Sequence, residues 1–149
     1  MTSKGLSGTI WRSLGAIFAG IVVAIVWTVG TDTILHAAGV FPAALGGAVG
    51  SGPLALATIY RTVYGVIGSY ITARLAPYKP MAHVMVSGLM GLAANALGMI
   101  ATWNKGPAYG PHWYPIALVV LALPTAWLGG WLWLAQHARS RDEQPMRSA

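Results

Sequence analysis

Four long apolar runs are the feature of this sequence that most constrains its fold. They cover residues 14–35, 54–76, 81–103 and 113–134. Each has about 22 residues and would be about 33 Å long as a helix, which matches a hydrocarbon core of about 30 Å. We therefore predict an all-α membrane protein, with four transmembrane helices in an up-down-up-down bundle.

The composition of the chain agrees with a membrane location. Hydrophobic residues make up 56% of the chain and charged residues 8%, where soluble domains carry about a quarter charged residues. A soluble globular fold is therefore disfavoured. The chain has no cysteine, which excludes disulfides, Cys-ligated zinc and iron–sulfur clusters.

The first apolar run has an alternative interpretation as a signal peptide. Lys4 and Arg12 would form its basic n-region, and residues 36–39 faintly suggest a cleavage site. However, the run is longer than the apolar region of a signal peptide, and it contains Asp32. We therefore expect it to be a membrane span that stays in the protein.

Basic residues orient the predicted bundle. Lys105 falls on one side of it, and the other side holds Lys4, Arg12, Arg74, Lys79, Arg139, Arg141 and Arg147. By the positive-inside rule, we expect both termini in the cytoplasm and the loops 39–53 and 104–112 outside, in a bacterial inner (plasma) membrane. The expected organisation is a four-helix transmembrane domain, residues 1–138, followed by a polar, basic cytoplasmic tail, residues 139–149.

Small and polar residues recur at helical spacing in the first three runs. Such stripes mark helix contacts in membranes, because lipid supplies no hydrophobic drive between helices. The stripes are Gly20, Ala24, Thr28, Asp32 and His36; Arg61, Gly65, Gly68 and Thr72; and Ser87, Gly91, Asn95, Gly98 and Thr102. We expect these three stripes to meet at the bundle axis, and a kink at Pro124 in the fourth helix.

Two charged residues inside the runs carry most of the functional information. Counted from the centres of their spans, Asp32 lies about 12 Å and Arg61 about 6 Å from the midplane, both in the outer half. A lone charge there costs on the order of 3 kcal/mol, so pairing is favoured. We predict an Asp32–Arg61 ion pair with Tyr60, Tyr64 and Asn95 as hydrogen-bonding neighbours. The pair is either a clamp that fixes helix register or part of a ligand or proton site.

The four histidines form a second candidate site. By topology, His36 and His112 lie at the outer boundary, and His83 and His137 at the inner one. Two histidine pairs across a four-helix bundle would suit bis-histidine ligation of two b haems. Asp32, His36 and His112 could instead hold Zn²⁺. Solvated interfacial histidines are the simpler interpretation, so we expect no bound cofactor and keep haem b and Zn²⁺ as alternatives.

Enzyme motifs are absent from the sequence. It contains no His-Glu-x-x-His, Gly-x-Ser-x-Gly or Walker A pattern, so we assign no catalytic residue and favour a role without catalysis. We predict a transporter-like or channel-like protein, or an accessory subunit of a membrane complex; the alternative is electron transfer through haems bound at the two histidine pairs. The predicted outward-facing polar site consists of Asp32, His36, Arg61, Tyr64, Asn95 and His112.

The expected partners follow from where the basic residues lie. They flank the apolar runs and do not form a solvated patch with interleaved aromatic residues, so anionic lipid headgroups are favoured over nucleic acid. A four-helix chain also offers little interior volume. A transport role would therefore favour a homodimer or association with a larger membrane complex.

Overall fold

The structure, a computed structural model, describes residues 3–41, 50–106 and 109–142. Within these ranges it has no strand, and its helices are α1 (Ser3–Ala37), α2 (Ser51–Leu75), α3 (Pro80–Thr102) and α4 (Trp113–Asp142). Each of the four is long and apolar enough to cross a membrane. The prediction of an all-α chain with four membrane-spanning helices is confirmed, and the chain has the architecture of a multi-pass membrane protein.

The first and last helices extend beyond the predicted spans. α1 begins at Ser3 and not at residue 14, and α4 continues to Asp142, past the predicted end at residue 134. The first four residues of the predicted tail are therefore helical, and residues 143–149 lie outside the described residues. Hydropathy marks only the part of a helix that suits lipid, whereas backbone hydrogen bonding continues past that boundary.

Prolines define the short connection between α2 and α3. Ala76 precedes Pro77, and its ψ of 126° is the extended conformation that a following proline favours. Pro80 then lies in the first turn of α3, where its missing N–H has no helical partner to lose. Between these prolines, Lys79 adopts a left-handed conformation with φ of 39°. This tight turn joins the end of α2 to the start of α3.

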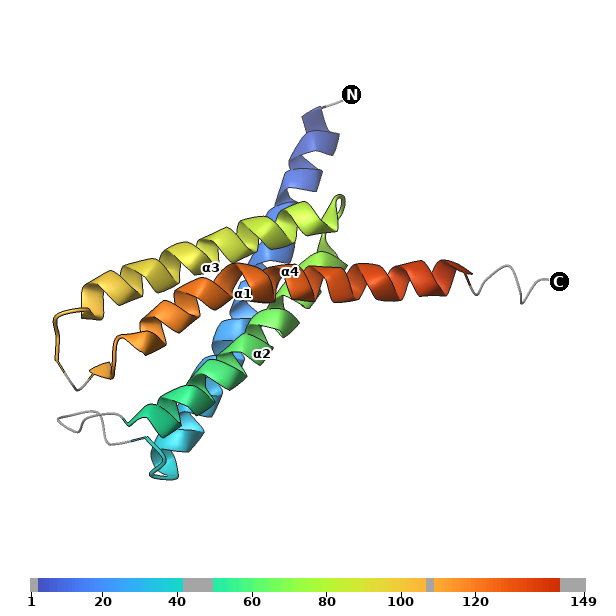
Figure 1. Cartoon of the computed structure of the whole chain (residues 1–149). Helices are drawn as coiled ribbons and strands as arrows, with labels where there is room; N and C mark the ends of the chain where they lie inside the picture. Colours follow the sequence, from blue (N-terminus) through green and yellow to red (C-terminus); the bar gives the residue numbers. More distant parts are fainter. Residues whose placement is uncertain (1–2, 42–49, 107–108, 143–149) are drawn as a thin grey trace.

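The four helices pack as two hairpins that cross each other (Figure 1). α1 lies along α2, and α3 lies along α4. The hairpins are joined mainly by α2 and α4, while α1 contacts α3 only slightly. The first turns of α1 and the last turns of α4 project beyond the packed region in Figure 1. The direction in which each helix crosses a membrane, and the side on which the termini lie, stay predictions.

Glycines lie where the helices cross most closely. A Cβ added to Gly68 of α2 would be 2.6 Å from the carbonyl oxygen of Gly20 on α1. On α4, a Cβ on Gly129 would be 2.7 Å from the Cβ of Ser69, and one on Gly130 would be 2.9 Å from a side chain of α3. Small residues thus let backbones approach, which is how helices associate without a hydrophobic drive.

The prediction that stripes on the first three helices meet at the bundle axis is incomplete, because α4 also packs at the centre of the bundle. Ala126, Gly129 and Gly130 are buried there, between α2 and α3. Ala122, Ala126 and Gly130 follow the same four-residue spacing as the other stripes, so the sequence did carry the signal. Pro124 lies inside α4, which is a single helix from Trp113 to Asp142. The kink expected at Pro124 stays a prediction.

The α1–α2 crossing gives a first testable prediction. We expect Gly68→Ala to lower the free energy of unfolding by about 1–3 kcal/mol, the usual cost of overpacking. The matched control is Gly98→Ala on α3, since no atom of the described residues lies within 4 Å of a Cβ at that position. The control should be neutral or slightly stabilising, because alanine favours helix over glycine. Thermal unfolding in one detergent measures both; equal midpoints would contradict the assigned crossing.

Candidate functional site

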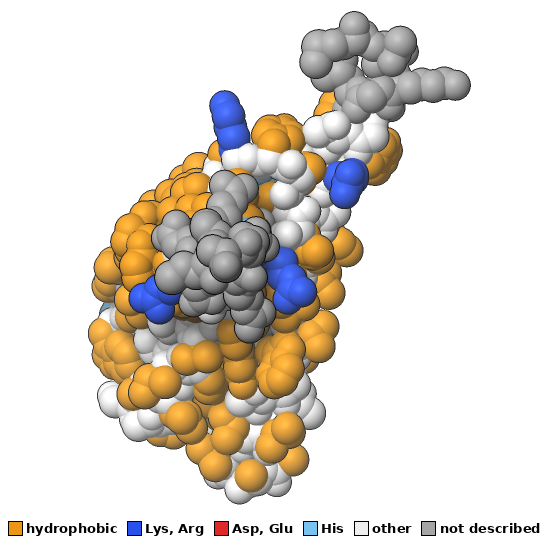
Figure 2. Space-filling view, turned by 90° about the vertical axis from the view of Figure 1, so that its right-hand side faces the viewer, with side chains coloured by type: hydrophobic (Ala, Val, Ile, Leu, Met, Phe, Trp, Pro, Cys, Tyr) orange, Lys and Arg blue, Asp and Glu red, His pale blue; other side chains and the backbone are white. Residues whose placement is uncertain are grey.

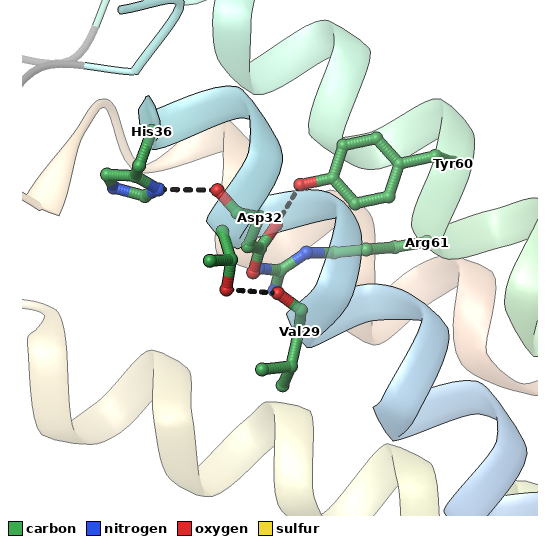
Figure 3. Close-up of polar contacts among 6 residues, drawn as sticks. Val29, Asp32, His36, Tyr60 and Arg61 are labelled. Carbon is green, nitrogen blue, oxygen red and sulfur yellow. Dashed lines mark hydrogen bonds and ion pairs between the residues drawn. The ribbon is translucent and has the colours of Figure 1, made fainter. Parts of the chain in front are cut away.

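Asp32 of α1 and Arg61 of α2 form an ion pair (Figure 3). Nη2 of Arg61 donates a hydrogen bond of 2.7 Å to Oδ2 of Asp32. The hydroxyl of Tyr60 donates to the other carboxylate oxygen, Oδ1. Both oxygens of Asp32 therefore accept a hydrogen bond from α2. The predicted ion pair is confirmed, together with Tyr60 as its hydrogen-bonding neighbour.

The helix crossing explains why these two side chains meet. Asp32 lies 12 residues beyond Gly20 on α1, about 18 Å along the helix, whereas Arg61 lies seven residues before Gly68 on α2, about 10 Å. The two backbones touch at this pair of glycines, so the charged groups start at different distances from the crossing. The long Arg61 side chain covers the difference, as expected for an arginine whose charged group extends away from its backbone.

The ion pair is partly buried. The exposed fraction is 33% for the Arg61 side chain and 26% for the Asp32 side chain. The guanidinium also lies over the ring of Tyr114 on α4, 5.9 Å from the ring centroid, in a cation–π contact. Nε of Arg61 is buried and has no hydrogen-bond partner among the described residues. Arg61 therefore contacts α1 and α4 and still has unused donor capacity.

Two of the predicted hydrogen-bonding neighbours have other partners. The Tyr64 hydroxyl shares a hydrogen bond of 2.9 Å with Thr31 of α1. Nδ2 of Asn95 donates to the carbonyl of Leu118 over 3.2 Å, which joins α3 to α4. The expectation that Tyr64 and Asn95 would hydrogen-bond to the ion pair is not met, because the helix register gives each of them another partner. Both hold the helices around the ion pair.

A cavity of about 590 Å³ lies among the four helices. Its wall runs along α1 from Gly20 to Asp32 and along α2 from Arg61 to Ser69, so the ion pair lies at one end. Most members of the three predicted stripes line it, joined by Leu118, Leu121, Ala122, Thr125 and Ala126 of α4. This volume falls in the range of about 300–1,000 Å³ that is typical of small-molecule sites. The stripes thus line a cavity as well as making contacts.

The histidines at the predicted outer boundary each lie within hydrogen-bonding distance of a backbone carbonyl. Nδ1 of His36 lies 2.7 Å from the carbonyl of Asp32, and Nε2 of His112 lies 2.9 Å from the carbonyl of Trp103. In the described part of the chain, no group of three or more His, Asp or Glu side chains could hold a metal ion. Asp32, His36 and His112 therefore do not form the Zn²⁺ site considered from the sequence, because the Asp32 carboxylate faces Arg61.

The two histidines at the predicted inner boundary pack against aromatic neighbours. The ring of His83 meets the edge of Tyr78 with centroids 5.0 Å apart, and His137 stacks on Trp133 at 4.1 Å. His83 is buried and His137 is exposed. These contacts add no support for haem ligation, which stays a hypothesis from the sequence.

Sequence reasoning missed the contribution of α4 to the site. The site predicted from the sequence did not include Tyr114, whose ring lies under the Arg61 guanidinium. A signal was available, since an arginine inside a span needs partners and the fourth run opens with aromatic residues. The sequence could not show which of them faces inward.

Comparisons with known proteins add no identification. No protein-family model matches the chain, and no similar protein was found among curated proteins or solved structures. The fold and site together define a class, a multi-pass α-helical membrane protein with a partly open cavity between its helices that ends at an ion pair.

Coupling between Asp32 and Arg61 is a second testable prediction. We expect Asp32→Asn and Arg61→Gln each to destabilise the protein, because each leaves an uncompensated charge that is partly buried. The double variant should be more stable than the sum of the two losses by about 1–2 kcal/mol, a value reduced for partial exposure. Unfolding of the four proteins in mixed micelles completes the cycle. Strict additivity would mean that the ion pair contributes no coupling energy.

Proposed function

We propose that the protein binds a small molecule in the cavity between its four helices and acts, without catalysis, as a transporter-like membrane protein. The observation that carries this proposal is the cavity of about 590 Å³ with the Asp32–Arg61 pair at one end. A pair that served only as a clamp between α1 and α2 would need no such volume. Charged groups inside membrane spans are also functional candidates by default.

The distribution of basic side chains supports access to the cavity from outside. Arg74 and Lys79 are exposed at the α2–α3 connection, as are Arg12 and Arg139 on α1 and α4. Figure 2 shows Lys and Arg side chains on the face that carries the end of α4. By the positive-inside rule this side is cytoplasmic, with both termini, in a bacterial inner membrane. The ion pair then lies in the outer half of the bilayer.

Any coupling of transport to protons or cations would depend on Asp32. It is the one carboxylate within the four predicted spans, because the other acidic residues are Asp142 and Glu143 near the C-terminus. The small interior of four helices favours a homodimer, or a larger complex, as the working unit. The accessory-subunit alternative differs in its expectation of a stable partner protein that co-purifies in mild detergent.

Water access to the cavity is the third testable prediction. Because the chain has no cysteine, single cysteines can be introduced without removing native ones. We expect Gly91→Cys, in the cavity wall of α3, to react with a membrane-impermeant methanethiosulfonate reagent added outside. Ala93→Cys is the matched control, since Ala93 is exposed on the same helix outside the cavity wall. It should stay unreacted, because the thiolate that reacts does not form in lipid.

Two loop positions calibrate the labelling. Asn104→Cys should react from the outside and Tyr78→Cys only after the membrane is permeabilised, if the proposed orientation is right. Reaction of Tyr78→Cys alone in sealed cells would reverse the orientation. Equal protection of Gly91→Cys and Ala93→Cys would mean that the cavity is closed to water, and the proposed function would then be wrong.

A further inference from the structure

The hydrogen-bonding capacity left at the Asp32–Arg61 pair indicates the chemistry of the ligand, an inference that rests on the proposed function. Both carboxylate oxygens of Asp32 already accept, from Tyr60 and from Arg61. A guanidinium has five N–H donors, and the ion pair uses one of them at Nη2. Nε is buried, so the donors open to a ligand are the remaining N–H groups of the two Nη atoms, on a side chain that is one third exposed. The site therefore keeps more free donors on the Arg61 guanidinium than free lone pairs on the Asp32 oxygens.

The wall away from the ion pair offers mainly apolar surface. The hydroxyl of Thr62 donates to the carbonyl of Thr58 over 2.7 Å, and that of Thr125 donates to Leu121 over 2.8 Å. These hydroxyl hydrogens are satisfied within their own helices and are not offered to a ligand. A ligand that fills the cavity must therefore bury apolar surface along most of its length.

The cavity also has a side that faces the bilayer. Its wall includes Ile25 and Val29 of α1 and Met90 of α3, whose exposed fractions are 54%, 55% and 52%. α1 and α3 contact each other only slightly, so these side chains border a gap between two helices. In a membrane such exposed side chains face acyl chains. A molecule dissolved in the bilayer can reach the cavity from this side.

We propose that the cavity binds an amphipathic molecule whose polar end is a hydrogen-bond acceptor, a carboxylate or a carbonyl oxygen held by Arg61. Its apolar part lies along α1 toward Gly20, over about 18 Å at 1.5 Å per residue. A cationic head group is disfavoured at this position, because Arg61 repels it and already neutralises the charge of Asp32.

A photoreactive fatty acid tests this proposal. The protein is held in dodecyl maltoside, whose head group has neither a carbonyl nor an anionic oxygen, and is irradiated with palmitate that carries a diazirine in its chain. Intact-mass spectrometry counts the adducts, and peptide mapping should place them on α1 and α3. We expect Arg61→Gln to lower labelling by about tenfold or more, since it removes a charge-assisted hydrogen bond. Asp32→Asn should raise labelling by about threefold, because it frees the charge of Arg61.

Competition separates the two sources of an acceptor oxygen. Protection by oleate but not by its methyl ester would mean that the ligand is a carboxylate. Protection by both would mean that a neutral carbonyl suffices. Protection by dodecyltrimethylammonium equal to that by oleate would overturn the proposal, as would undiminished labelling of Arg61→Gln.

Two variants of α3 show whether the fatty acid occupies the cavity. Gly91→Leu places a large side chain in the cavity wall, where no atom of the described residues lies within 4 Å of a Cβ, and should lower labelling about tenfold. Gly98→Leu meets equally open space outside the cavity wall and should not change labelling. Equal labelling of both variants would overturn the proposal.

The cysteine experiment distinguishes failure of this inference from failure of the proposed function. Reaction of Gly91→Cys from outside, without specific labelling by the fatty acid, would leave the cavity as the functional site and overturn the ligand class. Absence of both results would overturn the two together.

Discussion

A carboxylate in the hydrocarbon region of a membrane needs a partner, and this requirement organises the site. Asp32 meets it with Arg61 and Tyr60, both on α2. Shifting α1 by one helical turn would move the carboxylate by about 5.4 Å and break a contact of 2.7 Å. The ion pair thus selects one register of α1 on α2. The position of Arg61 under this constraint also sets its contact with Tyr114 and its exposure to the cavity.

The cavity arises from the places where the helices contact one another. Helices that cross at glycines approach very closely at one level and separate with distance from it. Gly20 and Gly68 bring α1 and α2 together, while Gly129 brings α4 against α2. Gly91 differs from these, because no described atom lies near it and its missing side chain adds to the open volume. Glycine therefore has two roles in this fold, at contacts and at a cavity wall.

Features that depend on a single physical quantity were readable from the sequence. The spans follow from the thickness of a bilayer, and the Asp32–Arg61 pair follows from the cost of an isolated charge in lipid. The cavity, the central place of α4 and the contact of Tyr114 depend on crossing angles, which arise from many side chains at once. The histidines were equally hard to predict. Topology gives the expected depth of His36 and His112 in the membrane but not the direction in which their rings point. The helical extension of α4 to Asp142 was missed because polar residues carry no hydropathy signal.

The placement of both charges in one hairpin has a consequence for synthesis of the protein. α1 leaves the ribosome before α2, so Asp32 reaches the membrane ahead of its partner. The 29 residues from Asp32 to Arg61 take about 1.5–6 s to add at about 5–20 residues per second. Pairing within a hairpin keeps the delay this short, whereas a partner on α4 would prolong it. The α1–α2 hairpin is therefore the earliest unit that can enter the bilayer with its charges matched.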